Sequence, residues 1–116
     1  MFKQGDIVKV SLDPIQGHEQ KGYRPVLIIQ NDLLSQAIQS TTVVLPISNS
    51  KTSMPFEVEL PKKLKTTGKV LCRQIRALDL SMRKCKYVET VPEGILDECL
   101  DNVTKVISKW IRISNS

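Results

Sequence analysis

The spacing of apolar residues changes once along this chain, and that change limits the folds it can adopt. Up to about residue 91, apolar residues form short segments that are β-branched or alternate with polar residues, which is typical of β-strands. The strands predicted in this way are residues 6–14, 25–30, 41–48, 54–60, 66–79 and 86–91. From Pro92 to about Ile111 the apolar residues recur every three or four positions, which predicts an amphipathic helix of about five turns. The members of this apolar stripe are Leu96, Cys99, Leu100, Val103, Val106, Ile107 and Trp110.

The order of these elements favours a β-rich fold with one terminal helix. Pro92 suits the first helical turn, because its fixed backbone angle is helical and its missing N–H is not needed there. One or two further helical turns are expected at 31–38, with Asn31 or Asp32 as the N-cap. Strands without β-α-β alternation predict an α+β, mainly β fold, in which a helix packs on a compact antiparallel barrel or curved sheet.

The composition narrows the class of protein further. A chain of 116 residues without repeats or linkers is expected to form a single domain over residues 1–116. With aromatic residues at only 4%, the core must consist mainly of Val, Ile and Leu. No apolar run approaches the roughly 20 residues that span a bilayer, and the N-terminus lacks the apolar stretch of a signal peptide, so we expect a cytoplasmic protein.

The cysteines and the histidine do not suggest a metal site. The chain has three widely spaced cysteines, Cys72, Cys85 and Cys99, and one histidine, which are too few ligands for a zinc site. We therefore expect reduced and mostly buried thiols, and no metal or cofactor.

The basic residues are distributed unevenly. The formal net charge is +5 at pH 7. Residues 62–86 contain nine Lys or Arg residues and one acid, Asp79, whereas residues 89–101 contain five acids and no base. A one-sided positive stripe is what binding of a polyanion requires, although a solvated surface explains the same charges.

Four short segments carry residues suited to chemistry, and one of them is the basic connection from Lys62 to Lys69. The loop GHEQKGYRP at 17–25 holds the only histidine of the chain beside a carboxylate and an arginine. PISNS at 46–50 places small polar residues just past a strand end. CRQIR at 72–76 lies within a predicted strand, which would point Arg73 and Gln74 to opposite faces.

These groups suit cleavage of RNA without a metal, with the substrate's own 2′-OH as the nucleophile. The protein must then move protons and stabilise charge on phosphorus. Arg24 offers a forked donor to the phosphate, Ser48 offers a hydroxyl, and His18 and Glu19 are the proton-transfer groups of the loop. The same residues also fit an ordinary polar connector, so on their own they equally allow a basic β-rich domain that only binds RNA.

A set of motifs follows in order along residues 5–107. It begins with Gly5-Asp6, Leu12-Asp13-Pro14, Gly17-His18-Glu19-Gln20 and Gly22-x-Arg24-Pro25. It continues with LPISNS, Pro55-Phe56, TTGKVLCRQIRALDLSMR and VPEGILDECLDNV. In this order and without large gaps, the motifs resemble the MazF/PemK (Kid-type) toxins of bacterial toxin–antitoxin modules.

The resemblance implies a fold, an activity and partners. Members of this family form a small SH3-like, partly open β-barrel with a C-terminal helix, and they act as homodimers. They cut single-stranded RNA, mainly mRNA, at short sequences and without a metal, leaving a 2′,3′-cyclic phosphate and a 5′-OH. A cognate antitoxin blocks the RNA groove with an acidic, otherwise disordered segment. The basic stripe suits both partners, because RNA and an acidic peptide are polyanions.

The resemblance also assigns roles to residues. Arg24 is expected as general acid and phosphate stabiliser, and Ser48 stands where the family has a threonine or serine. His18 and Glu19 belong to a loop that lies over the substrate. The residues expected to bind RNA are Gln20, Lys21, Asn49, Ser50, Lys69, Arg73, Gln74 and Arg76.

One position departs from the family. Several members have an acidic residue, with a proposed base role, where this chain has Arg73, and an arginine cannot accept a proton at working pH. The base is then Glu19 or, as second choice, His18, unless catalysis relies on positioning and electrostatics. An altered base-sequence preference is a third explanation.

Two rival functions remain from the sequence. A gyrase-binding toxin of the CcdB type would need a C-terminal Trp-Gly-Ile end, whereas here Trp110 is followed by Ile111 without a glycine. A non-catalytic RNA-binding homologue of the same barrel would keep the basic residues and lack cleavage. Trp110 itself is expected to lie in the core or at an interface.

Overall fold

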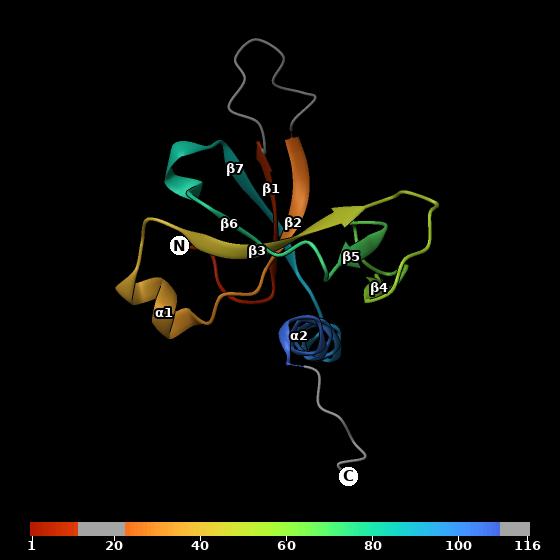
Figure 1. Ribbon diagram of the computed structural model, residues 1–116. Helices are drawn as coiled ribbons and strands as arrows, with labels where there is room; N and C mark the ends of the chain where they lie inside the picture. Colours follow the sequence, from red (N-terminus) through yellow and green to blue (C-terminus); the bar gives the residue numbers. More distant parts are fainter. Residues whose placement is uncertain (12–22, 110–116) are drawn as a thin grey trace.

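Seven short strands form one antiparallel sheet, and two helices and a single 3-10 turn complete the described part of the chain. The computed structural model describes residues 1–11 and 23–109, drawn as a ribbon in Figure 1. In chain order the elements are β1 (Asp6–Ser11), β2 (Tyr23–Ile28), α1 (Asp32–Ala37), β3 (Thr42–Ser48), β4 (Glu57–Glu59), β5 (Lys69–Leu71), β6 (Arg76–Leu78), η1 (Leu80–Met82), β7 (Cys85–Thr90) and α2 (Glu93–Ile107).

Strand β3 connects the two halves of the sheet. One of its edges pairs with β2, while β6 and β5 share the other edge. The strand order is β4-β5-β3-β2-β1-β7, and every pair is antiparallel. α2 lies across one end of this sheet in Figure 1. The predicted α+β, mainly β fold, with a partly open antiparallel sheet and a C-terminal helix, is therefore confirmed.

Both faces of the central strands are buried, because successive residues alternate between two apolar clusters. On β1, Ile7 belongs to one cluster and Val8 and Val10 belong to the other. The first cluster also contains Leu27, Leu45, Ile47, Val58, Val70, Cys72 and Cys99. The second contains Val26, Ile28, Val44 and Leu78. Val, Ile and Leu dominate both clusters, as the composition predicts.

Both predicted helices are present, with shorter bounds for the terminal one. Asn31 caps α1, since its side chain accepts a hydrogen bond of 2.8 Å from the backbone N–H of Leu34. α2 begins at Glu93 and ends at Ile107, and the apolar stripe packs its residues Leu96, Cys99, Leu100 and Val103 on the first cluster. Ile107, in the last turn, is exposed, and Trp110 lies outside the described residues.

The predicted strand 66–79 is wrong, because the chain breaks it into β5 and β6. Both run antiparallel to β3 along the same edge, but Val70 pairs with Ile47 while Arg76 pairs with Val44. The chain thus advances six residues against three on β3. The surplus forms a turn, closed by a 3.0 Å hydrogen bond from the Gln74 N–H to the Leu71 carbonyl. Arg73 and Gln74 therefore do not alternate across a strand, because they lie in this turn.

Other strand bounds differ by a few residues. The predicted strand 54–60 shortens to β4, because Phe56 has a φ of 61°, a left-handed conformation in which regular pairing stops. The end of the predicted strand 6–14 lies outside the described residues.

The thiols are free, and two of the three are fully buried, as predicted. Cys72 and Cys99 lie in the core and Cys85 is half-buried. The hydrogen bond with Cys72, together with burial, raises the pKa of Cys99, so this thiol stays protonated. Neither α1 nor α2 is long and apolar enough to span a bilayer, and the described residues contain no other α-helix.

Candidate active site

Arg24 and Ser48 flank the place where β2 and β3 part. The described pairing of these strands ends at Val26 and Pro46, where Val26 lies two residues after Arg24 and Pro46 lies two residues before Ser48. Beyond it, β2 stays paired with β1 through Arg24, whereas β3 turns to pair Ser48 with Lys69 of β5. Pro46 has no N–H to donate, and it lies between the part of β3 that pairs with β6 and the part that pairs with β5. The sheet thus opens between the two residues for which the sequence predicts phosphate contacts.

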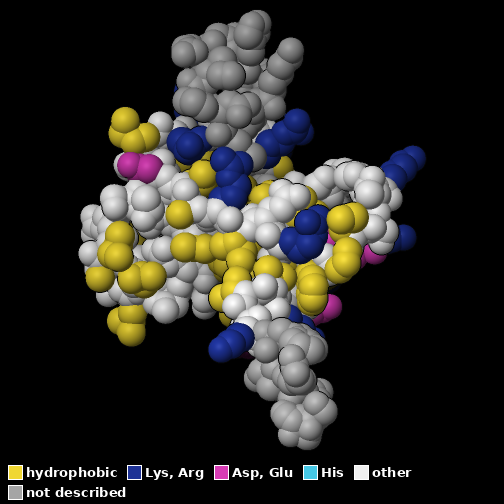
Figure 2. Space-filling view, in the orientation of Figure 1, with side chains coloured by type: hydrophobic (Ala, Val, Ile, Leu, Met, Phe, Trp, Pro, Cys, Tyr) yellow, Lys and Arg dark blue, Asp and Glu magenta, His cyan; other side chains and the backbone are white. Residues whose placement is uncertain are grey.

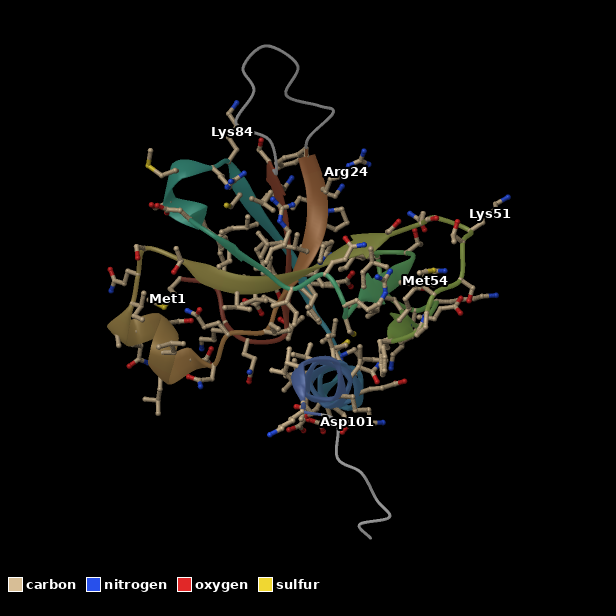
Figure 3. The ribbon with its side chains drawn as sticks, in the orientation of Figure 1. Met1, Arg24, Lys51, Met54, Lys84 and Asp101 are labelled. Atoms are coloured by element: carbon tan, nitrogen blue, oxygen red, sulfur yellow. The ribbon has the colours of Figure 1, made fainter. Side chains whose placement is uncertain are left out.

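A groove of about 500 Å³ lies at this opening and is strongly basic. It is lined by four cationic side chains, by two tyrosines and by Asn49, and none of its described lining residues is an acid. The cations are Lys9, Arg24, Lys65 and Lys86, and the tyrosines are Tyr23 and Tyr87. Figure 2 shows Lys and Arg side chains gathered over the upper end of the sheet, and Figure 3 shows Arg24 there, at the end of β2.

Two of these cations are direct neighbours across strands. Lys9 of β1 lies opposite Lys86 of β7 in the register, and opposite Pro25 on its other side. Like charges directly opposite each other destabilise a sheet. A bound anion would relieve the repulsion between Lys9 and Lys86 in this acid-free groove.

A second groove of about 400 Å³ adjoins the first. Asn49 and Thr67 line both grooves, and the Thr67 hydroxyl donates a 3.2 Å hydrogen bond to the Asn49 side-chain oxygen. Ser48 lines the second groove, where its Oγ accepts a 3.0 Å hydrogen bond from the Ser50 N–H. The hydroxyl hydrogen of Ser48 has no acceptor among the described residues, so Ser48 can donate to a phosphoryl oxygen.

Lys69 is engaged within the protein as well as lining the second groove. Its ammonium lies 3.2 Å from the Glu57 carboxylate and donates a 2.7 Å hydrogen bond to the Thr52 carbonyl. The Met54 N–H, Lys69 and the nearby Arg73 hold the pKa of Glu57 below its usual range. Lys69 therefore anchors the segment after Ser48, in addition to its predicted contact with RNA.

Three of the predicted RNA-binding residues lie apart from both grooves. Arg73 and Gln74 lie in the turn between β5 and β6, and Arg76 is exposed on β6; none of them lines either groove. The Nε atom of Arg73 is buried and has no hydrogen-bond partner in the part of the chain described. Arg73 lies near enough to Glu57 for its charge to help lower the pKa of that carboxyl.

The predicted loop residues His18, Glu19, Gln20 and Lys21 lie outside the described residues. The residues that bound this segment are placed: Ser11 pairs with Tyr23, and Arg24 follows directly. Asn49 and Ser50, predicted from the strand end, both line the second groove. Within the described ranges, no three His, Cys, Asp or Glu side chains form a group that could hold a metal ion.

The sequence reading missed several residues of the first groove. Lys9, Lys65 and Lys86 come from three separate parts of the chain, and only the strand register brings them together. Tyr87 is 50% exposed although it lies in a strand. An exposed aromatic residue in an alternating segment was the available signal, but the face on which it lies depends on the β-bulge between Ile7 and Val8.

Comparison with known proteins places this chain in a family. A family model described as PemK-like, MazF-like toxin of type II toxin–antitoxin system matches residues 3–107. Endoribonuclease PemK of Escherichia coli is 37% identical over 111 residues, which cover 92% of this chain and 83% of the relative. Endoribonuclease MazF of Staphylococcus saprophyticus is 40% identical over 91 residues, covering 74% and 75%.

Solved structures agree with these relatives. A crystal structure of MazF from Deinococcus radiodurans matches with a TM-score of 0.78 and 27% identity, covering 91% of this chain and 96% of that one. A MazE–MazF complex from the same organism matches with a TM-score of 0.78 at 22% identity, and it covers 94% of this chain and 97% of the other. The latter likeness supports the fold alone. On the family model and the curated relatives, this chain belongs to the PemK-like, MazF-like toxins of type II toxin–antitoxin systems.

Proposed function

We propose that this protein is an endoribonuclease toxin that cleaves single-stranded RNA, mainly mRNA, at short sequences and without a metal. The observation that carries the proposal is the position of Arg24 and Ser48 on either side of the opening between β2 and β3. Arg24 lines an acid-free groove that holds four cations, and Ser48 lines the adjoining groove. The names of the relatives, Endoribonuclease PemK and Endoribonuclease MazF, support the same reaction class.

The proposed reaction uses the 2′-OH of the substrate as nucleophile. That oxygen attacks the adjacent phosphorus, the bond to the 5′-oxygen breaks, and the products are a 2′,3′-cyclic phosphate and a 5′-OH. Arg24 binds the phosphoryl oxygens through its forked donors and protonates the leaving oxygen, while Ser48 donates a hydrogen bond to the phosphate. Lys9, Lys65 and Lys86 hold neighbouring phosphates of the strand.

The proton of the 2′-OH needs an acceptor. Arg73 cannot supply it, and its side chain does not line either groove. We assign this role to Glu19, with His18 as the second choice, because the segment that carries them begins and ends beside Arg24. Catalysis by positioning and electrostatics alone is the alternative. Glu19→Gln and His18→Ala, compared in cleavage-rate profiles against pH, distinguish the three.

The family description also suggests the partners. We propose that a cognate antitoxin inserts an acidic, otherwise disordered segment into the same basic groove, so that it competes with RNA. We further propose that the protein acts as a homodimer in the cytoplasm, where mRNA is present.

The test is incubation of the purified protein with long single-stranded RNA in EDTA, followed by mapping of both new ends. We expect cleavage at a short sequence, with cyclic-phosphate and 5′-OH ends. Arg24→Ala should abolish it, whereas Lys105→Ala, on the exposed face of α2, should cleave like the wild type. Tight binding without cleavage would instead identify an RNA-binding homologue, and cleavage that survives Arg24→Ala would refute the assigned chemistry.

A further inference from the structure

The wall shared by the two grooves is the loop of residues 65–68, and a residue of a strand that is distant in sequence holds this loop in place. Thr66 and Thr67 of this loop line the first groove, and Thr67 and Gly68 line the second. The loop's anchor is Glu89, more than 20 residues away on β7. One Glu89 carboxylate oxygen accepts a 3.0 Å hydrogen bond from the Lys65 N–H, and the other accepts a 2.7 Å bond from the Thr66 N–H.

The far end of the loop touches the residues that bear the proposed chemistry. The Thr67 hydroxyl donates to the Asn49 side chain. Gly68 has a φ of +116°, and a Cβ built on it would lie 2.5 Å from the Ser48 carbonyl oxygen. The backbone of Gly68 is therefore packed directly on the backbone of Ser48. A displacement of the loop must displace Ser48 or Asn49 as well.

The negative charge of Glu89 is engaged by the loop, since both carboxylate oxygens accept hydrogen bonds from its amides. A free carboxylate next to a groove with four cations would weaken the binding of phosphates. Glu89 instead directs both oxygens at amide donors. Although partial burial opposes the shift, these donors and the neighbouring Lys65 hold the pKa of Glu89 below its usual range. Two charge-assisted bonds to consecutive amides fix the orientation of a loop more firmly than one neutral bond does.

We propose that Glu89 is a positioning residue for the cleavage reaction. It fixes the loop of residues 65–68, and the loop holds Ser48 and Asn49 at the opening between β2 and β3. Glu89 does not touch the substrate in this account. The proposal rests on the proposed function, because its kinetic consequence is measured on RNA cleavage.

The experiment compares Glu89→Gln with a matched control, Glu98→Gln, which removes an exposed carboxylate on α2. A glutamine has one side-chain oxygen where Glu89 has two, and its NH2 group would face an amide N–H, so it cannot reproduce both bonds. We expect amide hydrogen exchange of Lys65 and Thr66 to become about tenfold faster or more in Glu89→Gln, and the NMR resonances of Ser48 and Asn49 to shift. Both sets of signals should stay unchanged in Glu98→Gln.

Kinetics separate positioning from mere stability. In Glu89→Gln we expect kcat on RNA to fall by about tenfold to a hundredfold, while KM changes about threefold or less, since a small misplacement affects the transition state more than binding. The protein is assayed well below its melting temperature, so that the folded fraction does not enter. Thr67→Val removes the loop's bond to Asn49, and its loss of rate should combine with that of Glu89→Gln in a non-additive way.

Each outcome has a consequence. Unchanged Ser48 and Asn49 resonances in a Glu89→Gln protein that has lost amide protection would overturn the coupling, and so would a wild-type kcat or full additivity with Thr67→Val. Absence of cleavage by the wild type would refute the proposed function instead. In that case the exchange and resonance measurements still decide whether Glu89 positions Ser48.

Discussion

Replacing Gly68 by alanine should both destabilise the protein and misplace Ser48. The added Cβ would lie 2.5 Å from the Ser48 carbonyl oxygen and 2.9 Å from its carbonyl carbon, and ordinary contact begins at 3.4 Å. The backbones must therefore separate by up to about 0.9 Å, because neither contact involves a flexible side chain. At a φ of +116° the alanine is strained even where there is space.

The magnitude follows from these two effects. A residue held in a sparsely populated backbone region costs about 1–3 kcal/mol. Overpacking of a tight contact costs about 1–3 kcal/mol more. We therefore expect the free energy of unfolding to fall by roughly 2–6 kcal/mol, which lowers Tm by about 10 °C or more in a domain of this size. A misplacement near 1 Å can cost about a hundredfold in rate, so RNA cleavage should fall on that order at a temperature where the variant is folded.

Gly94 supplies the matched control. It lies in the first turns of α2, and a Cβ there would meet nothing within 4 Å. Gly94→Ala should therefore leave cleavage unchanged and stabilise the protein by about 0.5–1 kcal/mol. Thermal and urea unfolding, with single-turnover cleavage, measure both variants. A Gly68→Ala protein with the Tm and cleavage rate of the wild type would refute the packing argument.

Three further predictions concern charge. Arg24→Lys keeps a cation but loses the forked donor, so cleavage should fall about a hundredfold while RNA affinity changes little; equal loss of binding and rate in a filter assay would contradict this. Lys9→Ala should reduce the slope of log affinity against log salt by about one, as should Lys86→Ala, and an unchanged slope would remove either residue from the RNA contact. Because the folded-state pKa values of Glu57 and Glu89 lie below their ordinary value of 4.5, their contribution to stability is complete above that pH and is lost as pH falls through the lowered values. The urea midpoint should therefore drop as the pH falls below 4.5, beyond the drop of a Glu89→Gln protein, and identical profiles would refute the linkage.

The sequence predicted the elements whose physics is local. The apolar alternation of β1 and β3 and the three-to-four spacing of α2 are visible within each segment's own sequence. The N-cap at Asn31 likewise depends only on its own side chain. The strand over 66–79 failed for a non-local reason. Its residues have β-type apolar alternation, but between the Val70–Ile47 and Arg76–Val44 pairs the chain has three residues more than β3, and this surplus leaves the sheet as a turn.

In the candidate site, too, the residues next to strand ends could be expected from the local sequence, whereas those brought together by strand pairing could not. The positions of Arg24 and Ser48 at the grooves could be expected, because each is a polar residue next to a strand end. Lys9 and Lys86 could not, since a strand sequence does not state its partner or its register. No sequence pattern indicated a role for Glu89, because that role depends on two hydrogen bonds from backbone amides of a loop more than 20 residues away.

The register error also bears on the missing base. Continued from the pair of Lys69 with Ser48, a strand over 66–79 would place Arg73 opposite Val44, four residues from Ser48 along β3. In the structure, Arg73 lies in the turn formed by the surplus residues, where it is near Glu57 and lines neither groove. An arginine at a position that does not face the grooves removes no proton acceptor from them. The substitution of an acid by Arg73 is therefore compatible with cleavage, provided that the acceptor comes from the segment that joins β1 to β2, beside Arg24.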